Sequence, residues 1–223
     1  MNSAIEFPPL LTGIAVPGDP WEAACAAARA DADPGTVFYA IDDLTMRVAI
    51  LLAPEEPLED AVRASFAVTL GFNDALGALA PPEVALHLVW PAGIKVNGAA
   101  CGTLRAAAST DDPEAEPDWL VLALEVPVVC DLDGSNPDQT ALHNEGCGEV
   151  LIPDLIEAWG RHMMNWLHIY MTDGFEPLHR EWLTKADGRE EGHFLGLDER
   201  GGLLLKDDTG TRILPLTDLL EPS

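Results

Sequence analysis

The sequence predicts an α+β fold in which helices pack on a mixed, largely antiparallel sheet, followed by a small C-terminal β-module. Three observations support it. The elements read in order as helix, two strands, helix, hairpin, strand, two helices and a meander, which favours α+β. Asn97-Gly98 lies between two apolar runs, a strong signal for a tight hairpin. From Gly192 onward, short apolar runs alternate with tight turns.

Composition limits the classes of partner. Of the 223 residues 48% are hydrophobic, which is enough for a core, and 38 acidic against 12 basic residues give a formal charge of −26. Such a charge repels nucleic acid and anionic membrane, so neither is an expected partner. No apolar stretch is long enough to span a bilayer.

The cysteines and the N-terminus indicate the compartment. No Lys or Arg precedes the first apolar run, which Pro8 and Pro9 interrupt, so this segment is a poor signal peptide. Without such a signal the scattered cysteines are expected to be reduced thiols. We therefore expect a cytoplasmic protein.

The N-terminal half is expected to contain a short helix, two strands and a longer helix. Asp19 is a helix cap, and the helix that follows runs to about Ala30. Residues 36–41 and 47–53 are β-branched or apolar runs, which predict two strands joined by a turn. Pro57 opens a helix whose apolar residues recur at helical spacing.

The second half is expected to add a hairpin, a buried strand and two helices. Residues 84–90 form a strand that enters the hairpin, and the second arm of the hairpin covers 99–107. Residues 119–129 are almost continuously apolar, as in a strand buried on both faces. Pro153 begins an amphipathic helix, and a shorter helix over 177–186 follows.

The last segment is expected to be a separate small module. A β-meander of this length buries little surface alone, so it should pack on the main domain. The predicted boundaries are 1–190 for the main domain and 191–223 for the module.

Three pieces of sequence resemble the biotin/lipoate protein ligases. Residues 90–104, WPAGIKVNGAACGTL, are similar to their WPNDIxVNGKKxGGIL hairpin, in which a lysine holds the acyl carboxylate and adenylate. Residues 173–183, DGFEPLHREWL, resemble the helix that closes their catalytic domain. Residues 193–216 resemble the SH3-like C-terminal domain of the biotin protein ligases.

The resemblance implies a fold and a ligand class. The fold would be the α+β architecture of class II synthetases and biotin ligases, with an SH3-like module. The ligand would be a small carboxylate-bearing acid of the biotin, lipoate or fatty-acyl type. An active ligase would use ATP with biotin or lipoate and would modify a biotinyl or lipoyl carrier domain.

The departures from the family pattern lie where the chemistry should occur. Ala100 stands at the position of the catalytic lysine, and Ala92-Gly93 replace Asn-Asp. The Gly/Arg-rich loop (GRGRRGR type) should lie within YAIDDLTMRV, where Arg47 is the one basic residue. The strand that carries GxGxN reads ALEVPVV. Losing one donor to the transferring phosphate costs roughly 3–4 kcal/mol, so these losses together should abolish efficient adenylation unless another group compensates.

Lys95 is the candidate replacement. In a two-residue Asn97-Gly98 turn Lys95 pairs with Ala100, with Cβ atoms about 5 Å apart on one face. The alternative is a solvated strand lysine. We predict Lys95 as the catalytic residue. The residues predicted to bind the ligand beside it are Arg47, Trp90, Gly93, Ala100 and Gly102.

Cys147 is a second candidate. Its HNEGCGEV context is similar to the nucleophilic Cys-Gly of the octanoyltransferases in the same superfamily, but neighbouring carboxylates favour an unreactive cysteine. His143 with Cys147, Cys130 and Asp133 would make a metal site, yet paired CxxC or HExxH spacing is absent, so no metal is expected.

Two functions remain open. One is a divergent ligase or acyltransferase that uses Lys95. The other is a catalytically inactive homologue that acts as a binding or regulatory module. Carrier domains of this family are acidic around the modified lysine, so a net charge of −26 argues against a housekeeping ligase.

Overall fold

The main sheet has seven strands in the order β1-β2-β3-β7-β6-β5-β4. The computed structural model describes residues 5–40, 44–129, 138–187, 193–207 and 210–221. β1 and β2 are parallel and all other neighbours in this sheet are antiparallel, which confirms the predicted mixed, largely antiparallel sheet. The strands are β1 (Thr12–Val16), β2 (Thr36–Ala40), β3 (Thr45–Leu52), β4 (Leu86–Val89), β5 (Gly93–Val96), β6 (Ala99–Ala108) and β7 (Leu120–Pro127).

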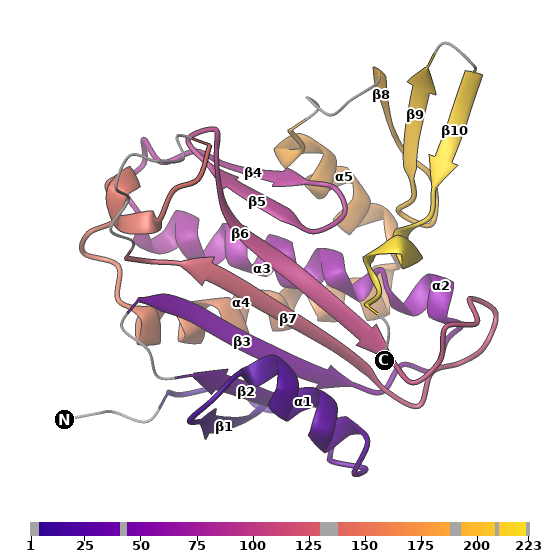
Figure 1. The fold of residues 1–223 in the computed structure, drawn as a ribbon, viewed down its shortest axis with the longest axis horizontal. Coiled ribbons are helices and arrows are strands. Elements are labelled where there is room, and N and C mark those ends of the chain that lie inside the picture. Colours follow the sequence, from indigo (N-terminus) through magenta and orange to yellow (C-terminus); the bar gives the residue numbers. More distant parts are fainter. Residues whose placement is uncertain (1–4, 41–43, 130–137, 188–192, 208–209, 222–223) are drawn as a thin grey trace.

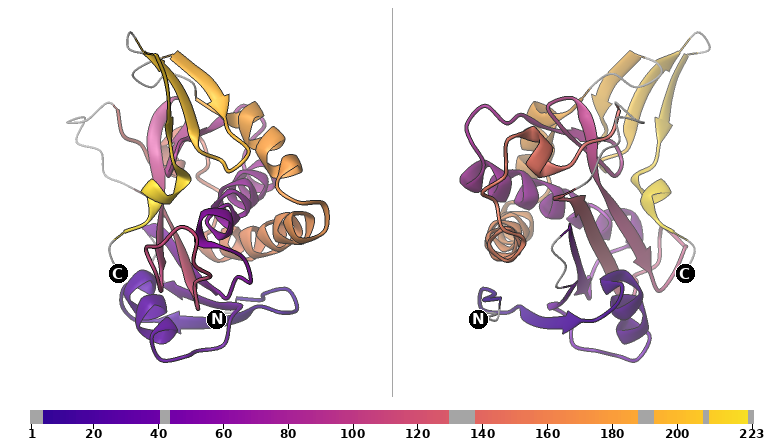
Figure 2. Two further views of the ribbon diagram at one scale, coloured as in Figure 1. Left: turned by 90° about the vertical axis from the view of Figure 1, so that its right-hand side faces the viewer. Right: turned by 60° about the vertical axis from the view of Figure 1, so that its left-hand side comes forward.

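Helices cover the two faces of this sheet unequally. Figures 1 and 2 show α3, α4 and α5 on one face, whereas α1 and the C-terminal segment lie on the other, here called the α1 face. The helices are α1 (Pro20–Ala28), α2 (Leu58–Ala61), α3 (Ala64–Leu79), α4 (Ile152–Asp173) and α5 (Glu176–Lys185). No helix in the described part of the chain is both long and apolar enough to cross a bilayer.

Strand alternation divides the core between these faces. In β7, Leu122 and Leu124 pack toward α3 and α4, whereas Val121 and Ala123 pack toward α1. The predicted burial of this strand on both faces is therefore confirmed as far as Leu124. Glu125, the next residue of the strand on the α1 face, is exposed.

The contact between α3 and α4 is close. A Cβ added to Gly71 would lie 2.7 Å from the Cα of Met163, so the helices approach at a position where one of them has no side chain. Trp159 is fully buried beside this contact, and its indole Nε1–H donates to the Val68 carbonyl at 3.2 Å.

Two elements differ from the expectation. The sequence does not predict β1, whose side chains are mostly exposed at the sheet edge and whose pairing with β2 compensates for a weak pattern. The helix predicted from Pro57 is two helices, α2 and α3, because the chain turns around Val62 and Arg63.

The predicted C-terminal meander forms a separate three-stranded antiparallel sheet. Its buried Leu203 and Leu205 belong to the same core as the main sheet, and the Trp90 indole N–H donates to the Gly201 carbonyl at 2.9 Å. Its likeness to an SH3 barrel and the boundary at residue 190 stay predictions. The strands are β8 (His193–Leu197), β9 (Leu203–Asp207) and β10 (Gly210–Leu214).

Candidate functional site

The hairpin places Lys95 as its turn chemistry predicts. Lys95 pairs with Ala100 across β5 and β6, and Asn97 adopts a φ of 51° in the turn. Ile94 and Val96 are buried in the core, so the intervening side chain of Lys95 leaves the sheet on the α1 face.

Lys95 has a partner from a distant part of the chain. Its Nζ lies 2.8 Å from Oδ2 of Asp187, and the two side chains are 30% and 16% exposed. Asp187 follows α5 and donates its backbone N–H to the carbonyl of Leu88 at 2.8 Å, which fixes it at the β4 edge of the sheet. The ammonium opposite Ala100 is therefore neutralised by a carboxylate of the same chain.

Arg47 lies on β3, two strands from β6 of the hairpin and three strands from β5. One row across the α1 face runs Arg47, Glu125, Thr103, Gly93, as the strand registers show. With neighbouring strands about 4.8 Å apart, Arg47 and Gly93 are about 14 Å apart. In the ALEVP segment Glu125 occupies the second glycine position of the GxGxN pattern, so it adds a carboxylate to this row.

Sequence reasoning missed Arg105, the second guanidinium of this region. Strand alternation puts Arg105 on the same face as Thr103, two residues earlier, so its position could have been predicted. Its guanidinium carbon lies 4.2 Å from the centre of the Trp21 ring, a cation–π contact.

Arg47 and Arg105 border one small cavity of about 10 Å³. Such a volume holds at most a single water, so the described residues leave no room for a biotin-sized ring at this point. The other predicted residues of the hairpin do not line this cavity; they are Lys95, Trp90, Gly93, Ala100 and Gly102. The residues that do are Asp19, Pro20, Trp21, Arg47, Val48, Arg105, Ala123, Leu124 and Glu125.

Three of the predicted ligand-binding positions have packing roles. Trp90 is 8% exposed and joins the hairpin to the C-terminal sheet. A Cβ at Gly102 would lie 2.9 Å from the carbonyl oxygen of Glu125, so β6 and β7 need glycine here. At Gly93 an added Cβ would lie 3.0 Å from the Cβ of Val89. Packing explains these residues without a ligand.

Cys147 lies buried near Cys101. Both side chains are 1% exposed. Burial, with Glu145 nearby, raises the pKa of the Cys147 thiol, and burial raises the pKa of Cys101 to about 12. Both thiols are therefore protonated at neutral pH, whereas a nucleophile must be a thiolate.

Slow thiol labelling is the expected consequence. In a Cys130→Ser background, iodoacetamide at pH 7 should modify Cys25, Cys101 and Cys147 at least about 100-fold more slowly in the folded chain than in urea. Mass spectrometry of quenched samples measures each rate. A Cys147 that reacts as fast in the folded chain as in urea would restore it as a nucleophile.

The described residues contain no group of three His, Cys, Asp or Glu side chains that could hold a metal ion. Nε2 of His143 lies 3.4 Å from the Val150 carbonyl. Cys130 and Asp133 lie outside the described residues.

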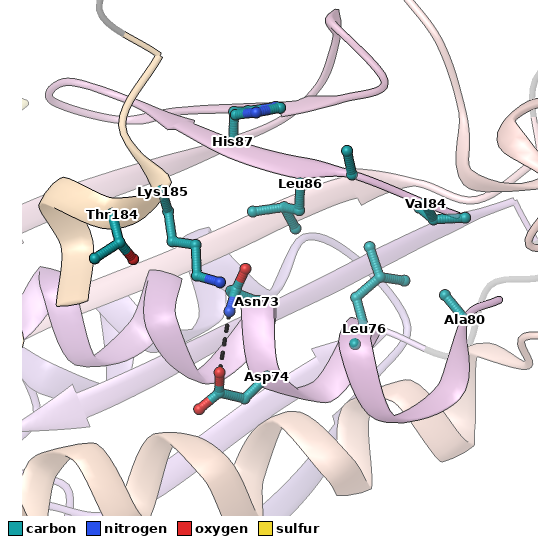
Figure 3. A pocket seen from close by; sticks show the side chains of 11 residues that line it. Asn73, Asp74, Leu76, Ala80, Val84, Leu86, His87, Thr184 and Lys185 are labelled. Carbon is teal, nitrogen blue, oxygen red and sulfur yellow. Dashed lines mark hydrogen bonds between the residues drawn. The ribbon is translucent and has the colours of Figure 1, made fainter. Parts of the chain in front are cut away.

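A much larger cavity, of about 650 Å³, lies between α3, β4 and α5. Figure 3 shows Lys185 reaching toward Asn73 and Asp74 at one end, with Leu76 and Val84 at the other. The Asp74 carboxylate accepts hydrogen bonds from Asn73 at 3.0 Å and from the Trp166 indole at 2.8 Å. No predicted site residue lines this cavity. Its lining residues are Asn73, Asp74, Leu76, Gly77, Ala80, Val84, Ala85, Leu86, His87, Thr184 and Lys185.

Comparison with known proteins agrees with the resemblance. The model of the Biotin/lipoate A/B protein ligase family matches residues 7–184, and that of a domain of unknown function (DUF4444) matches residues 184–222. A biotin–[acetyl-CoA-carboxylase] ligase from Paracoccus denitrificans is 23% identical over 185 residues, which are 76% of this chain and 77% of that protein.

Solved structures show the same fold. A biotin protein ligase-like protein of unknown function from Silicibacter sp. TM1040 is 46% identical, covers 98% of this chain and 100% of its own, and superposes with a TM-score of 0.93. The biotin protein ligase from Aquifex aeolicus in complex with biotin and ATP is 16% identical, with a TM-score of 0.71 over 91% of this chain and 95% of its own.

Proposed function

Because the chain belongs to the biotin/lipoate A/B protein ligase family, we propose that it binds a small carboxylate-bearing molecule of the biotin, lipoate or fatty-acyl type without adenylating it. Of the two functions that the sequence leaves open, this is the binding or regulatory module. The observation that carries the proposal is the ion pair between Lys95 and Asp187.

The ion pair bears directly on adenylation. Acyl adenylation needs preorganised cations aimed at the charge that develops on the transferring phosphate, and each such donor contributes roughly 3–4 kcal/mol. Ala100 supplies no charge, and the ammonium opposite it is held by Asp187. To act on a phosphate, Lys95 would first have to leave its carboxylate.

The residues of the α1 face do not fit a triphosphate. Lys95 and Arg105 each already bind a carboxylate of the chain, and Glu125 adds another negative charge beside Arg47. A monocarboxylate requires one cation and some apolar surface, whereas the triphosphate of ATP requires several cations. A biotinyl or lipoyl carrier domain is an expected partner only if the protein is an active ligase.

Pyrophosphate exchange separates the two functions. The full chain with ATP, Mg²⁺ and biotin, lipoate or octanoate is expected to exchange at background level, and Lys95→Ala should leave that level unchanged. The Paracoccus denitrificans ligase is the positive control. Isothermal titration calorimetry is expected to detect binding of at least one of the free acids.

Each part of the proposal has its own contradicting result. Acid-dependent exchange that disappears in Lys95→Ala would establish the divergent ligase instead. Failure of biotin, lipoate and octanoate alike to bind would remove the binding function.

A further inference from the structure

Arg105 already binds a carboxylate on the α1 face, that of Glu221 near the end of the chain. Nε of Arg105 lies 2.6 Å from Oε1 and Nη2 lies 2.7 Å from Oε2, so two N–H groups on one edge of the guanidinium donate in parallel. This fork is the geometry with which arginine recognises planar carboxylates. The Trp21 ring stacks on the guanidinium and holds its plane.

The backbone of the tail delivers this carboxylate. The Glu221 N–H donates to the Ala106 carbonyl at 2.8 Å, and Leu220 forms a parallel bridge with Ala106. The last described residues thus run beside the free edge of β6, where β5 has ended. The backbone of the tail is therefore held at this edge, whereas the Glu221 side chain stays partly exposed, at 41%, and can turn away from Arg105.

We propose that Arg105, stacked on Trp21, is the carboxylate-binding residue of this protein, and that Glu221 is an internal occupant which a small acid displaces. The inference rests on the proposed function: it names Arg105 as the residue that binds the acid and the Glu221 carboxylate as the group that competes with the acid. Arg105 borders the same small cavity as Arg47, but Glu221 does not line that cavity, so the acyl part of the acid would lie at the surface that Glu221 covers now.

The ion pair is weak enough to exchange. The side chains of Arg105 and Glu221 are 31% and 41% exposed, and half-exposed pairs of this kind favour the closed form by only about fivefold. When an internal group occupies a site, the apparent affinity for a ligand is the intrinsic affinity multiplied by the fraction of sites that are open. Glu221 therefore weakens acid binding about fivefold without preventing it.

The test compares acid affinities of full-length variants by calorimetry, with octanoate, biotin and lipoate as probes. Glu221→Gln removes the competing charge and is expected to bind the acid about fivefold more tightly than the unchanged protein. Glu176→Gln is the matched control, since it breaks the exposed pair with Arg180, at 2.9 Å, and changes the net charge equally. It should bind as the unchanged protein does.

A second variant tests the guanidinium itself. Arg105→Lys in the Glu221→Gln background keeps the positive charge but loses the fork, and should bind about tenfold more weakly than Glu221→Gln alone. Thermal unfolding of each variant verifies that the fold is intact.

The other outcomes overturn the inference in distinguishable ways. Equal affinity of the unchanged protein and Glu221→Gln would remove Glu221 as a competitor while leaving the proposed function in place. Weaker binding in Lys185→Ala, with no effect of Glu221→Gln, would place the acid in the cavity beside β4. Failure of all variants to bind would remove both the inference and the binding function.

Discussion

Trp159→Ala is expected to lower the free energy of unfolding by about 3–5 kcal/mol, because it removes a fully buried indole between α3 and α4. The surrounding helices cannot close around the space, since the chain at Gly71 is already in contact with Met163. The lost hydrogen bond to the Val68 carbonyl adds to the effect. Urea unfolding followed by circular dichroism measures the change.

Met171→Ala provides the control on the same helix. Its side chain is 83% exposed, so the free energy of unfolding should change by less than about 0.5 kcal/mol. Similar effects at both positions would show that α4 is not packed as described.

Gly71→Ala is expected to lower the free energy of unfolding by about 2–3 kcal/mol, whereas Gly77→Ala on the same helix should raise it by about 0.5–1 kcal/mol. An added Cβ at Gly71 meets the backbone N and Cα of Met163 at 2.7 Å, and a backbone cannot rotate away. At Gly77 an added Cβ has no neighbour within 4 Å, so the better helix propensity of alanine decides the sign.

The opposite signs make this pair of variants diagnostic. Both changes remove the same conformational freedom from the unfolded chain, so the difference between them reports the helix contact alone. Equal changes in the urea midpoint would contradict the close approach of α3 and α4.

The sequence predicted those features that depend on near neighbours along the chain. The Asn97-Gly98 turn determines that Lys95 faces Ala100, and the apolar run over 119–129 predicts a buried strand. β1 was missed because Thr12–Val16 has no alternating burial and depends on pairing with β2.

The partners of the site cations could not be predicted in the same way. Lys95 and Asp187 are 92 residues apart, and Arg105 and Glu221 are 116 apart. Such pairs follow from how α5 and the C-terminal segment return to the sheet. The residue types suggested a cationic site, whereas only the fold shows that two of its cations already hold carboxylates.

The way the chain end returns to the sheet has a consequence for biosynthesis. Gly201 is made 111 residues after its partner Trp90, and Glu221 is made 116 residues after its partner Arg105. Until then the indole N–H and the guanidinium lack those partners, although most strands of the main sheet already exist. The nascent protein therefore passes through a stage in which the Arg105 guanidinium lacks the Glu221 carboxylate, and this stage lasts until Glu221 has left the ribosome.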